Sequence, residues 1–240
     1  MTMPAVTSGD PAVFAFVVIP LGLLMLLLWG THVASRRLNE DDGTRRNAVL
    51  ITVVVSAVWM TATWRAGESG VLRLWYATPP PFALLVVGIL GLTVALACTK
   101  YGRRLALGLP LWALVGIQGF RLPLELSMHT MYGRGVMPEQ MSYSGRNFDI
   151  ITGITALAVA WLVFSGRVGR RVVLTWNILG LLLVLNVMTV GILSTPRFRL
   201  FGDDRLNVFV TYPPFVWLPA VMVLAALAGH LIVFRALSRR

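Results

Sequence analysis

Residues 12–29 read AVFAFVVIPLGLLMLLLW and contain no charged side chain. A helix rises 1.5 Å per residue, so about 20 apolar residues cross the hydrocarbon core of a bilayer, which is about 30 Å thick. Six further apolar runs of similar length follow along the chain. The sequence therefore predicts an all-α, polytopic bundle of seven transmembrane helices, at residues 12–29, 48–64, 82–98, 105–122, 148–164, 172–193 and 215–237.

The composition supports a lipid environment for the whole chain. Of the 240 residues 57% are hydrophobic and only 13% are charged, about half the charged fraction of a soluble domain. The net charge of +11 raises the question of a nucleic-acid partner. Its arginines, however, stand in small groups between apolar runs, as membrane topology requires. We therefore expect the lipid bilayer as a partner and no nucleic acid, with the whole chain forming a single transmembrane domain.

The basic residues also predict the direction of the bundle. Cytoplasmic connections are enriched in Arg and Lys. The links after the first, third and fifth runs, together with the C-terminal tail, carry most of them: Arg36, Arg37, Arg45, Arg46, Lys100, Arg103, Arg104, Arg167, Arg170, Arg171, Arg235, Arg239 and Arg240. We expect an N-terminus outside and a C-terminus inside. The first run has neither a positive start nor a convincing cleavage site, so it is expected to remain as an anchor.

Polar residues in or beside the spans are the first candidates for function, because unsatisfied polar groups are costly in lipid. Gln118, Arg121 and Glu125 share one helix face by their spacing of three and four. Two further polar segments, residues 145–149 and residues 197–214, are expected on the same outer side. Together these segments predict an outward-facing pocket whose candidate ligand-binding residues are Gln118, Arg121, Glu125, Arg146, Asn147, Asp149, Arg197 and Tyr212.

Each of these residues also has a purely structural interpretation. Arg121 and Glu125 pair at an interface in that view, with the arginine head reaching water. Asn147 caps a helix, and Asp149 faces the positive end of the helix dipole. The convergence of the three segments favours a shared site.

His32 follows the first span and His230 lies in the last, so the two could hold a haem iron axially. Ordinary hydrogen-bonded histidines are the simpler interpretation, and we expect no metal or other cofactor. Cys98 is the only cysteine and is expected to be a buried thiol. Retinal bound as a Schiff base is excluded because residues 215–237 contain no lysine. Pro110 and Pro219 are expected to kink the fourth and seventh spans.

Two motifs of the C-terminal half, GRNFDI at residues 145–150 and YPPFVWLP at residues 212–219, carry a resemblance. Roughly residues 115–235 resemble a group of uncharacterised bacterial multi-pass membrane proteins. The resemblance implies the bacterial cytoplasmic (inner) membrane and brings no activity.

Three functional hypotheses remain open at this point. The chain binds or transports a small polar or anionic ligand, with arginines supplying positive charge. Alternatively it is a membrane-embedded enzyme that uses Glu125 and Asp149 as acid and base, which requires the two carboxyl groups to lie near each other. The third hypothesis is an accessory subunit of a membrane complex. An oligomer is compatible with all three.

Overall fold

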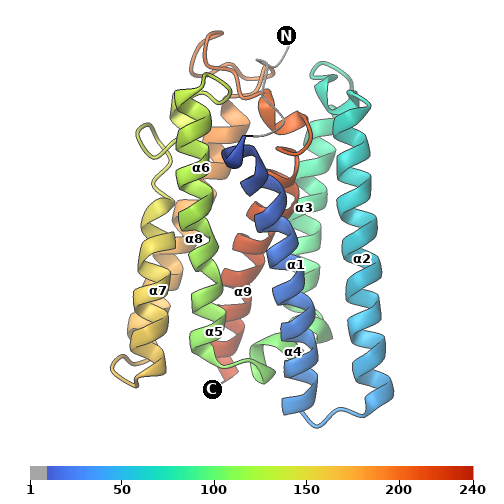
Figure 1. The fold of residues 1–240 in the computed structure, drawn as a ribbon, viewed down its shortest axis with the longest axis vertical. Helices are drawn as coiled ribbons and strands as arrows, with labels where there is room; N and C mark the ends of the chain where they lie inside the picture. The colour runs from blue at the N-terminus through green and yellow to red at the C-terminus, as the bar shows by residue number, and fades with distance from the viewer. Residues whose placement is uncertain (1–9, 240) are drawn as a thin grey trace.

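The computed structural model describes residues 10–239, and these residues form an all-α bundle (Figure 1). Residues 1–9, which include most of the segment predicted to lie outside, and Arg240 fall beyond the described part. The helices are α1 (Pro11–Arg37), α2 (Asp42–Glu68), α3 (Pro81–Cys98), α4 (Lys100–Gly108), α5 (Leu111–Gly116), α6 (Arg121–Gly133), α7 (Ile150–Phe164), α8 (Arg170–Leu193) and α9 (Leu224–Arg239).

Helix α9 runs through the centre of the bundle and packs against α3, α4, α5 and α8. The stretch Leu218–Ser238 contains α9, and 61% of its apolar 18-residue segment is buried. The corresponding share is 22% in α1 and in α2. The outer helices expose apolar side chains such as Val58 and Leu157. Exposed apolar faces of this extent are stable only in contact with lipid.

Five helices are long and apolar enough to cross a membrane, judged by length and composition within the described residues. They are α1, α2, α3, α8 and the stretch Leu218–Ser238. A sixth span results if α4 and the following stretch Leu111–Gly133 count as one broken span. Helix α7, with 15 residues, is shorter than this criterion requires. The chain is therefore a multi-pass helical membrane protein.

The predicted fourth span, residues 105–122, is wrong as a single helix. The chain breaks at Leu109–Pro110, and the stretches Lys100–Gly108 and Leu111–Gly133 meet at 112°. The proline cannot continue the helical hydrogen bonds, and Leu109 before it adopts extended backbone angles, φ −98° and ψ 144°. After the break, α5, the 3₁₀ turn Ile117–Phe120 and α6 follow one another without interruption to Gly133. Helix α4 lies across the lower end of the bundle (Figure 1).

Pro219 lies in a wide helical turn rather than at a break, and the kink expected there stays a prediction. Residues Leu218–Val223 form a π-helical turn that leads into α9. Two tryptophans tie this turn to α2: Trp59 Nε1 donates to the Ala220 carbonyl at 2.7 Å, and Trp217 Nε1 donates to the Met60 carbonyl at 3.1 Å. Turns of this kind inside helices often mark functional positions.

Residues 134–149 bring irregular backbone, with one 3₁₀ turn at Glu139–Met141, into the bundle. Figure 1 shows α7 beginning well below the upper end of α6, so the connecting segment descends between the two levels. Gln140, Ser142 and Asn147 of this segment are buried. Irregular backbone is tolerated at membrane depth only where protein surrounds it. The descent carries Asn147 and Asp149 into the interior of the bundle.

Candidate functional site

Arg121 is the largest fully buried side chain, with 1% of its surface exposed. It begins α6, directly after the 3₁₀ turn. Its Nη1 lies 3.2 Å from Asp149 Oδ1, in front of α7, and 3.2 Å from Nε2 of His230 on α9. One guanidinium thus links three helices. A buried arginine is stable only where such partners compensate its charge.

His230 extends this contact to α8. Its Nδ1 lies 2.8 Å from Asn177 Oδ1, and Asn177 Nδ2 donates to the His230 carbonyl at 3.0 Å. A guanidinium can only donate, so Nε2 of His230 accepts from Arg121 and the ring proton resides on Nδ1. The hydrogen-bond pattern therefore requires a neutral imidazole.

Glu125, one turn after Arg121, is held by Asn147. The Asn147 Nδ2 donates to Glu125 Oε2 at 2.7 Å, and its Oδ1 accepts from the Asp149 backbone amide at 3.0 Å. Nδ2 also donates to the Met141 carbonyl at 2.9 Å. One amide side chain thus connects the two acidic residues and fixes the descending segment. The enzyme hypothesis requires these two residues to be near each other, and this arrangement meets that requirement.

Gln118, one turn before Arg121, faces α9. Its Nε2 donates to the Ala226 carbonyl at 3.1 Å. A Cβ added at Gly229 would lie 2.5 Å from that nitrogen, so the close approach of Gln118 to α9 needs a glycine there. We call these residues together the central polar cluster: Gln118, Arg121, Glu125, Asn147, Asp149, Asn177 and His230.

Several atoms of the central polar cluster lack a hydrogen-bond partner among the residues that the structure describes. They include Nε and Nη2 of Arg121 and Oε1 of Gln118. Buried polar atoms are normally hydrogen-bonded, and exceptions require an explanation such as a bound molecule. The unpartnered groups of Arg121 are donors, so they match an acceptor.

Two apolar layers flank the central polar cluster. Along α6 the layer above contains Leu124, Met128 and Met131, which belong to a core that also includes Phe209 and Phe215. The layer below contains Val115 of α5, Ala156 of α7, Val173 of α8 and Ile232 of α9. The central polar cluster therefore lies between two apolar core clusters, and the outward-facing pocket stays a prediction.

The positive and negative charges of the ionisable groups in the central polar cluster do not cancel. Arg121 supplies one positive charge, Glu125 and Asp149 supply two carboxyl groups, and the His230 ring is neutral. With both carboxyl groups ionised the cluster carries an excess negative charge in a buried setting, which is costly. An anion bound at the cluster would add to this excess, so its binding requires a compensating positive charge, such as a proton.

The structure places the remaining predicted residues elsewhere. The Arg146 guanidinium stacks over the Phe201 ring at 5.1 Å. Arg197 lies 6.0 Å from the Tyr76 ring, and the ring of Tyr212 receives the guanidinium of Arg73 at 4.2 Å. These contacts join loops and do not reach the central polar cluster. Asn177 and His230, by contrast, belong to it, although neither was among the predicted ligand-binding residues.

His32 and His230 occupy different environments. His32 is exposed and lines a cleft between α1 and α2, whereas His230 is fully buried with protein partners at both ring nitrogens. Among the described residues, no group of three or more His, Cys, Asp or Glu side chains is arranged to hold a metal ion. Cys98 is exposed rather than buried.

Comparisons with protein-family models, curated proteins and solved structures found no match to this chain. The resemblance in residues 115–235 thus identifies no family. What the fold and the hydropathy establish is a multi-pass helical membrane protein with a buried polar layer.

Proposed function

We propose that this protein binds and transports a small polar or anionic solute across a bacterial inner membrane, and that it takes up a proton as it does so. The central polar cluster is the proposed binding site. The observation that carries the proposal is the fully buried Arg121, which has unpartnered donors beside two carboxyl groups.

The proposal assigns a role to each charged group. Arg121 binds an acceptor of the solute through Nε and Nη2, which have no partner among the described residues. A bound anion adds to the negative charge of Glu125 and Asp149, so proton uptake offsets its cost. Glu125 is the proposed proton carrier, because Asn147 contacts it while Asp149 is paired to Arg121.

The buried geometry supports transport better than catalysis. Apolar layers flank the cluster on two sides, as expected of a state in which a solute is occluded. The π-helical turn at Leu218–Val223 and the broken backbone of residues 134–149 lie where membrane transporters commonly interrupt helices around a site. A membrane enzyme remains the second candidate because Asn147 connects both acidic residues.

Seven crossings, with the N-terminus outside and the C-terminus inside, form part of this proposal. Figure 1 shows α1, α2, α3, α5–α6, α7, α8 and α9 side by side along the long axis of the bundle. The 15 residues of α7 extend only about 22 Å at 1.5 Å per residue. The descending segment before α7 supplies the rest of that crossing.

A paired substitution tests the proposal without leaving a buried charge unpaired. The variant R121Q/D149N removes both members of the ion pair, and R104Q/E40Q removes a partly buried pair of 2.8 Å at the lower end as the matched control. Thermal shifts of purified protein are measured with a panel of phosphate, monocarboxylates, dicarboxylates and amino acids. We expect at least one panel member to bind. R121Q/D149N should weaken its binding about 10- to 100-fold, because one or two charged hydrogen bonds are lost. The control should bind as the unmodified protein does. Equal binding by the folded R121Q/D149N variant, or no binding by any panel member, contradicts the proposal.

A further inference from the structure

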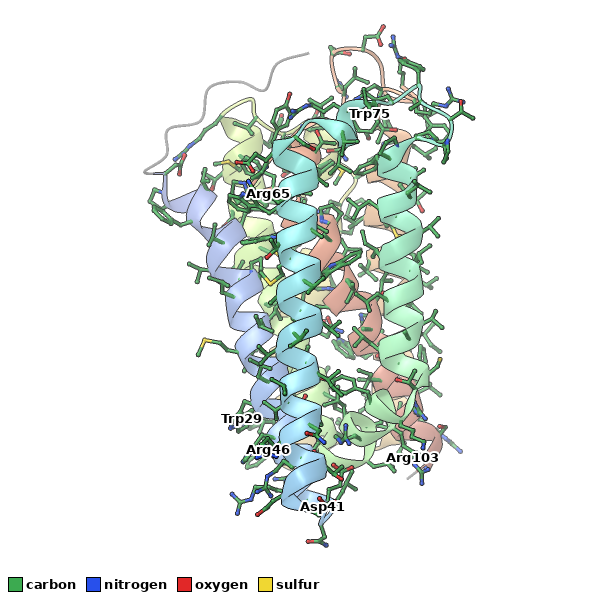
Figure 2. The ribbon with its side chains drawn as sticks, turned by 90° about the vertical axis from the view of Figure 1, so that its right-hand side faces the viewer. Trp29, Asp41, Arg46, Arg65, Trp75 and Arg103 are labelled. Atoms are coloured by element: carbon green, nitrogen blue, oxygen red, sulfur yellow. The ribbon has the colours of Figure 1, made fainter. Side chains whose placement is uncertain are left out.

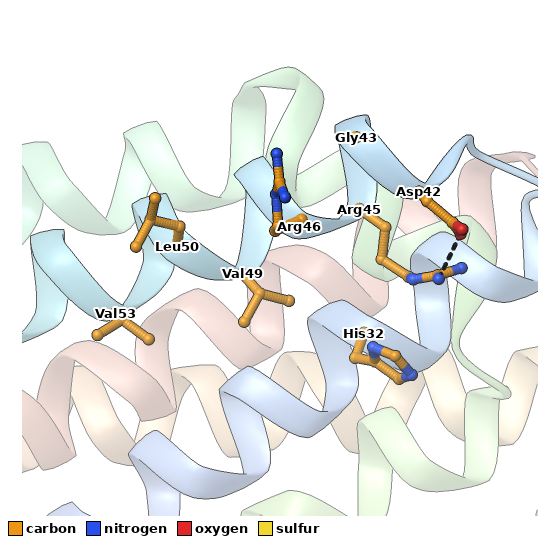
Figure 3. A pocket seen from close by; sticks show the side chains of 8 residues that line it. All are labelled: His32, Asp42, Gly43, Arg45, Arg46, Val49, Leu50 and Val53. Carbon is orange, nitrogen blue, oxygen red and sulfur yellow. Dashed lines mark hydrogen bonds and ion pairs between the residues drawn. The ribbon is translucent and has the colours of Figure 1, made fainter.

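A cleft of about 660 Å³ opens between the last turns of α1 and the first turns of α2, at the lower end of the bundle (Figure 3). His32 contributes from α1. Asp42, Arg45 and Arg46 contribute from α2, followed by Val49, Leu50 and Val53. The cleft lies far from the central polar cluster in sequence and shares none of its residues.

The charged part of the cleft is predominantly basic. Arg45 pairs with Asp42. The side chains of His32 and Arg46 form no hydrogen bond or ion pair with any part of the chain that the structure describes. The first turn of α2 also presents the positive end of the helix dipole. One end of the cleft therefore offers free donors and positive charge to an anion.

The opposite part of the cleft is apolar and follows the axis of α2. Val49 and Val53 are four residues apart and so lie on one helix face. Leu50 beside them is 57% exposed and Val53 is 41% exposed. Charge gives way to hydrocarbon over two turns of one helix, in the direction that leads into the membrane. A soluble anion does not need such an apolar extension, whereas an acyl chain does.

The level of the cleft in the membrane fits a lipid headgroup. Trp29, one turn before His32 on α1, is 60% exposed, and tryptophans of this kind gather at the membrane–water interface. Figure 2 shows Trp29 and Arg46 near each other at the same end of the bundle. We therefore expect His32, Arg45 and Arg46 to lie at the depth of lipid phosphates.

We propose that this cleft binds one anionic phospholipid of the leaflet at the lower end, with its phosphodiester among His32, Arg45 and Arg46 and an acyl chain along Val49, Leu50 and Val53. Basic pockets between transmembrane helices are a known form of anionic lipid recognition. The site is independent of the proposed solute site.

Lipid binding by the full chain in detergent micelles tests this site, with phosphatidylglycerol and phosphatidylcholine as probes and native mass spectrometry as the readout. The variant R45Q/R46Q removes the two arginines of the cleft. R36Q/R37Q is the matched control, because it removes two exposed arginines at the end of α1, about one turn after His32, that do not line the cleft. We expect R45Q/R46Q to weaken phosphatidylglycerol binding about 30-fold, at about 1 kcal/mol per arginine, and R36Q/R37Q to weaken it less than about 3-fold.

Two further variants make the assignment specific. Asp42→Asn removes the carboxylate that competes for Arg45, so we expect tighter phosphatidylglycerol binding. Leu50→Asn places a polar group on the apolar side and is expected to weaken binding, whereas Val54→Asn, on an exposed residue outside the cleft, is expected to have little effect. Equal losses in R45Q/R46Q and R36Q/R37Q would show that surface charge alone attracts the lipid. Equal affinity for phosphatidylcholine, or full displacement by millimolar inorganic phosphate, would also overturn the proposal.

Discussion

Nη1 of Arg121 lies 3.2 Å from Nε2 of His230, and this contact joins the start of α6 to the central helix α9. The arginine can only donate, so it fixes the proton of the imidazole on Nδ1, which faces Asn177 Oδ1 at 2.8 Å. A neutral histidine thus stands between a buried cation and a buried amide. The polar layer is therefore an ordered chain of donors and acceptors across α6, α9 and α8.

Replacement of His230 by phenylalanine should destabilise the bundle. The variant leaves Arg121 Nη1 without one acceptor and Asn177 Oδ1 without its donor, so we expect a loss of about 1–3 kcal/mol in the free energy of unfolding. His32→Phe, at an exposed histidine, serves as the control and should change it by less than about 0.5 kcal/mol. Thermal unfolding in detergent measures both. Equal stability of the two variants would show that the contact with Arg121 contributes nothing.

Gly180 of α8 should tolerate no side chain. A Cβ at this position would lie 2.6 Å from Cε1 of His230, so Gly180→Ala is expected to cost about 1–3 kcal/mol by overpacking. Gly91→Ala in α3 meets no atom within 4 Å and should stabilise its helix by about 0.5–1 kcal/mol. The two variants should shift the melting temperature in opposite directions. A stabilising Gly180→Ala would mean that α8 and α9 are not in the close contact described.

The Arg121–Asp149 pair should show strong coupling in a double-mutant cycle. Arg121→Gln alone leaves Glu125 and Asp149 buried without the arginine, which typically costs about 3–5 kcal/mol when one partner of a buried pair is removed. We expect R121Q/D149N to be more stable than the sum of the two single variants allows. Unfolding in detergent gives the three values, and additive losses would argue against a direct pair.

Labelling of single cysteines tests the proposed topology. In a Cys98→Ser background, Ser69→Cys and Ser165→Cys place a thiol at two exposed serines, one after α2 and one after α7. A membrane-impermeant maleimide added to intact cells should react with Ser69→Cys and should reach Ser165→Cys only after the membrane is opened. Reaction of both in intact cells would show that the 15 residues of α7 do not complete a crossing.

The sequence predicted part of the central polar cluster for a clear physical reason. Gln118, Arg121 and Glu125 share a face because helical spacing alone determines which residues are neighbours. Their depth in the membrane could not be predicted, because it depends on where the helix after Pro110 ends and on how residues 134–149 descend. Long-range packing decides both.

Polar residues that are adjacent in the sequence also make contacts in different parts of the structure, and no local pattern predicts this. Arg146 stacks on Phe201, while Asn147 turns inward to Glu125. In an irregular segment, successive side chains have no fixed relation, so a shared motif does not imply a shared site. Asn177 and His230 carried a usable signal, since both are polar residues inside predicted spans.

Solute-driven proton movement is the most direct test of the central claim. Proteoliposomes loaded with a pH-sensitive dye are exposed to gradients of the same panel of phosphate, carboxylates and amino acids. We expect at least one solute to move protons together with itself and to bind more tightly as pH falls, because binding takes up a proton. Glu125→Gln should abolish the proton movement, whereas Glu68→Gln, at a carboxylate with 55% of its side chain exposed, should leave it unchanged. Proton movement that persists in Glu125→Gln, or its absence with every solute of the panel, would contradict the account.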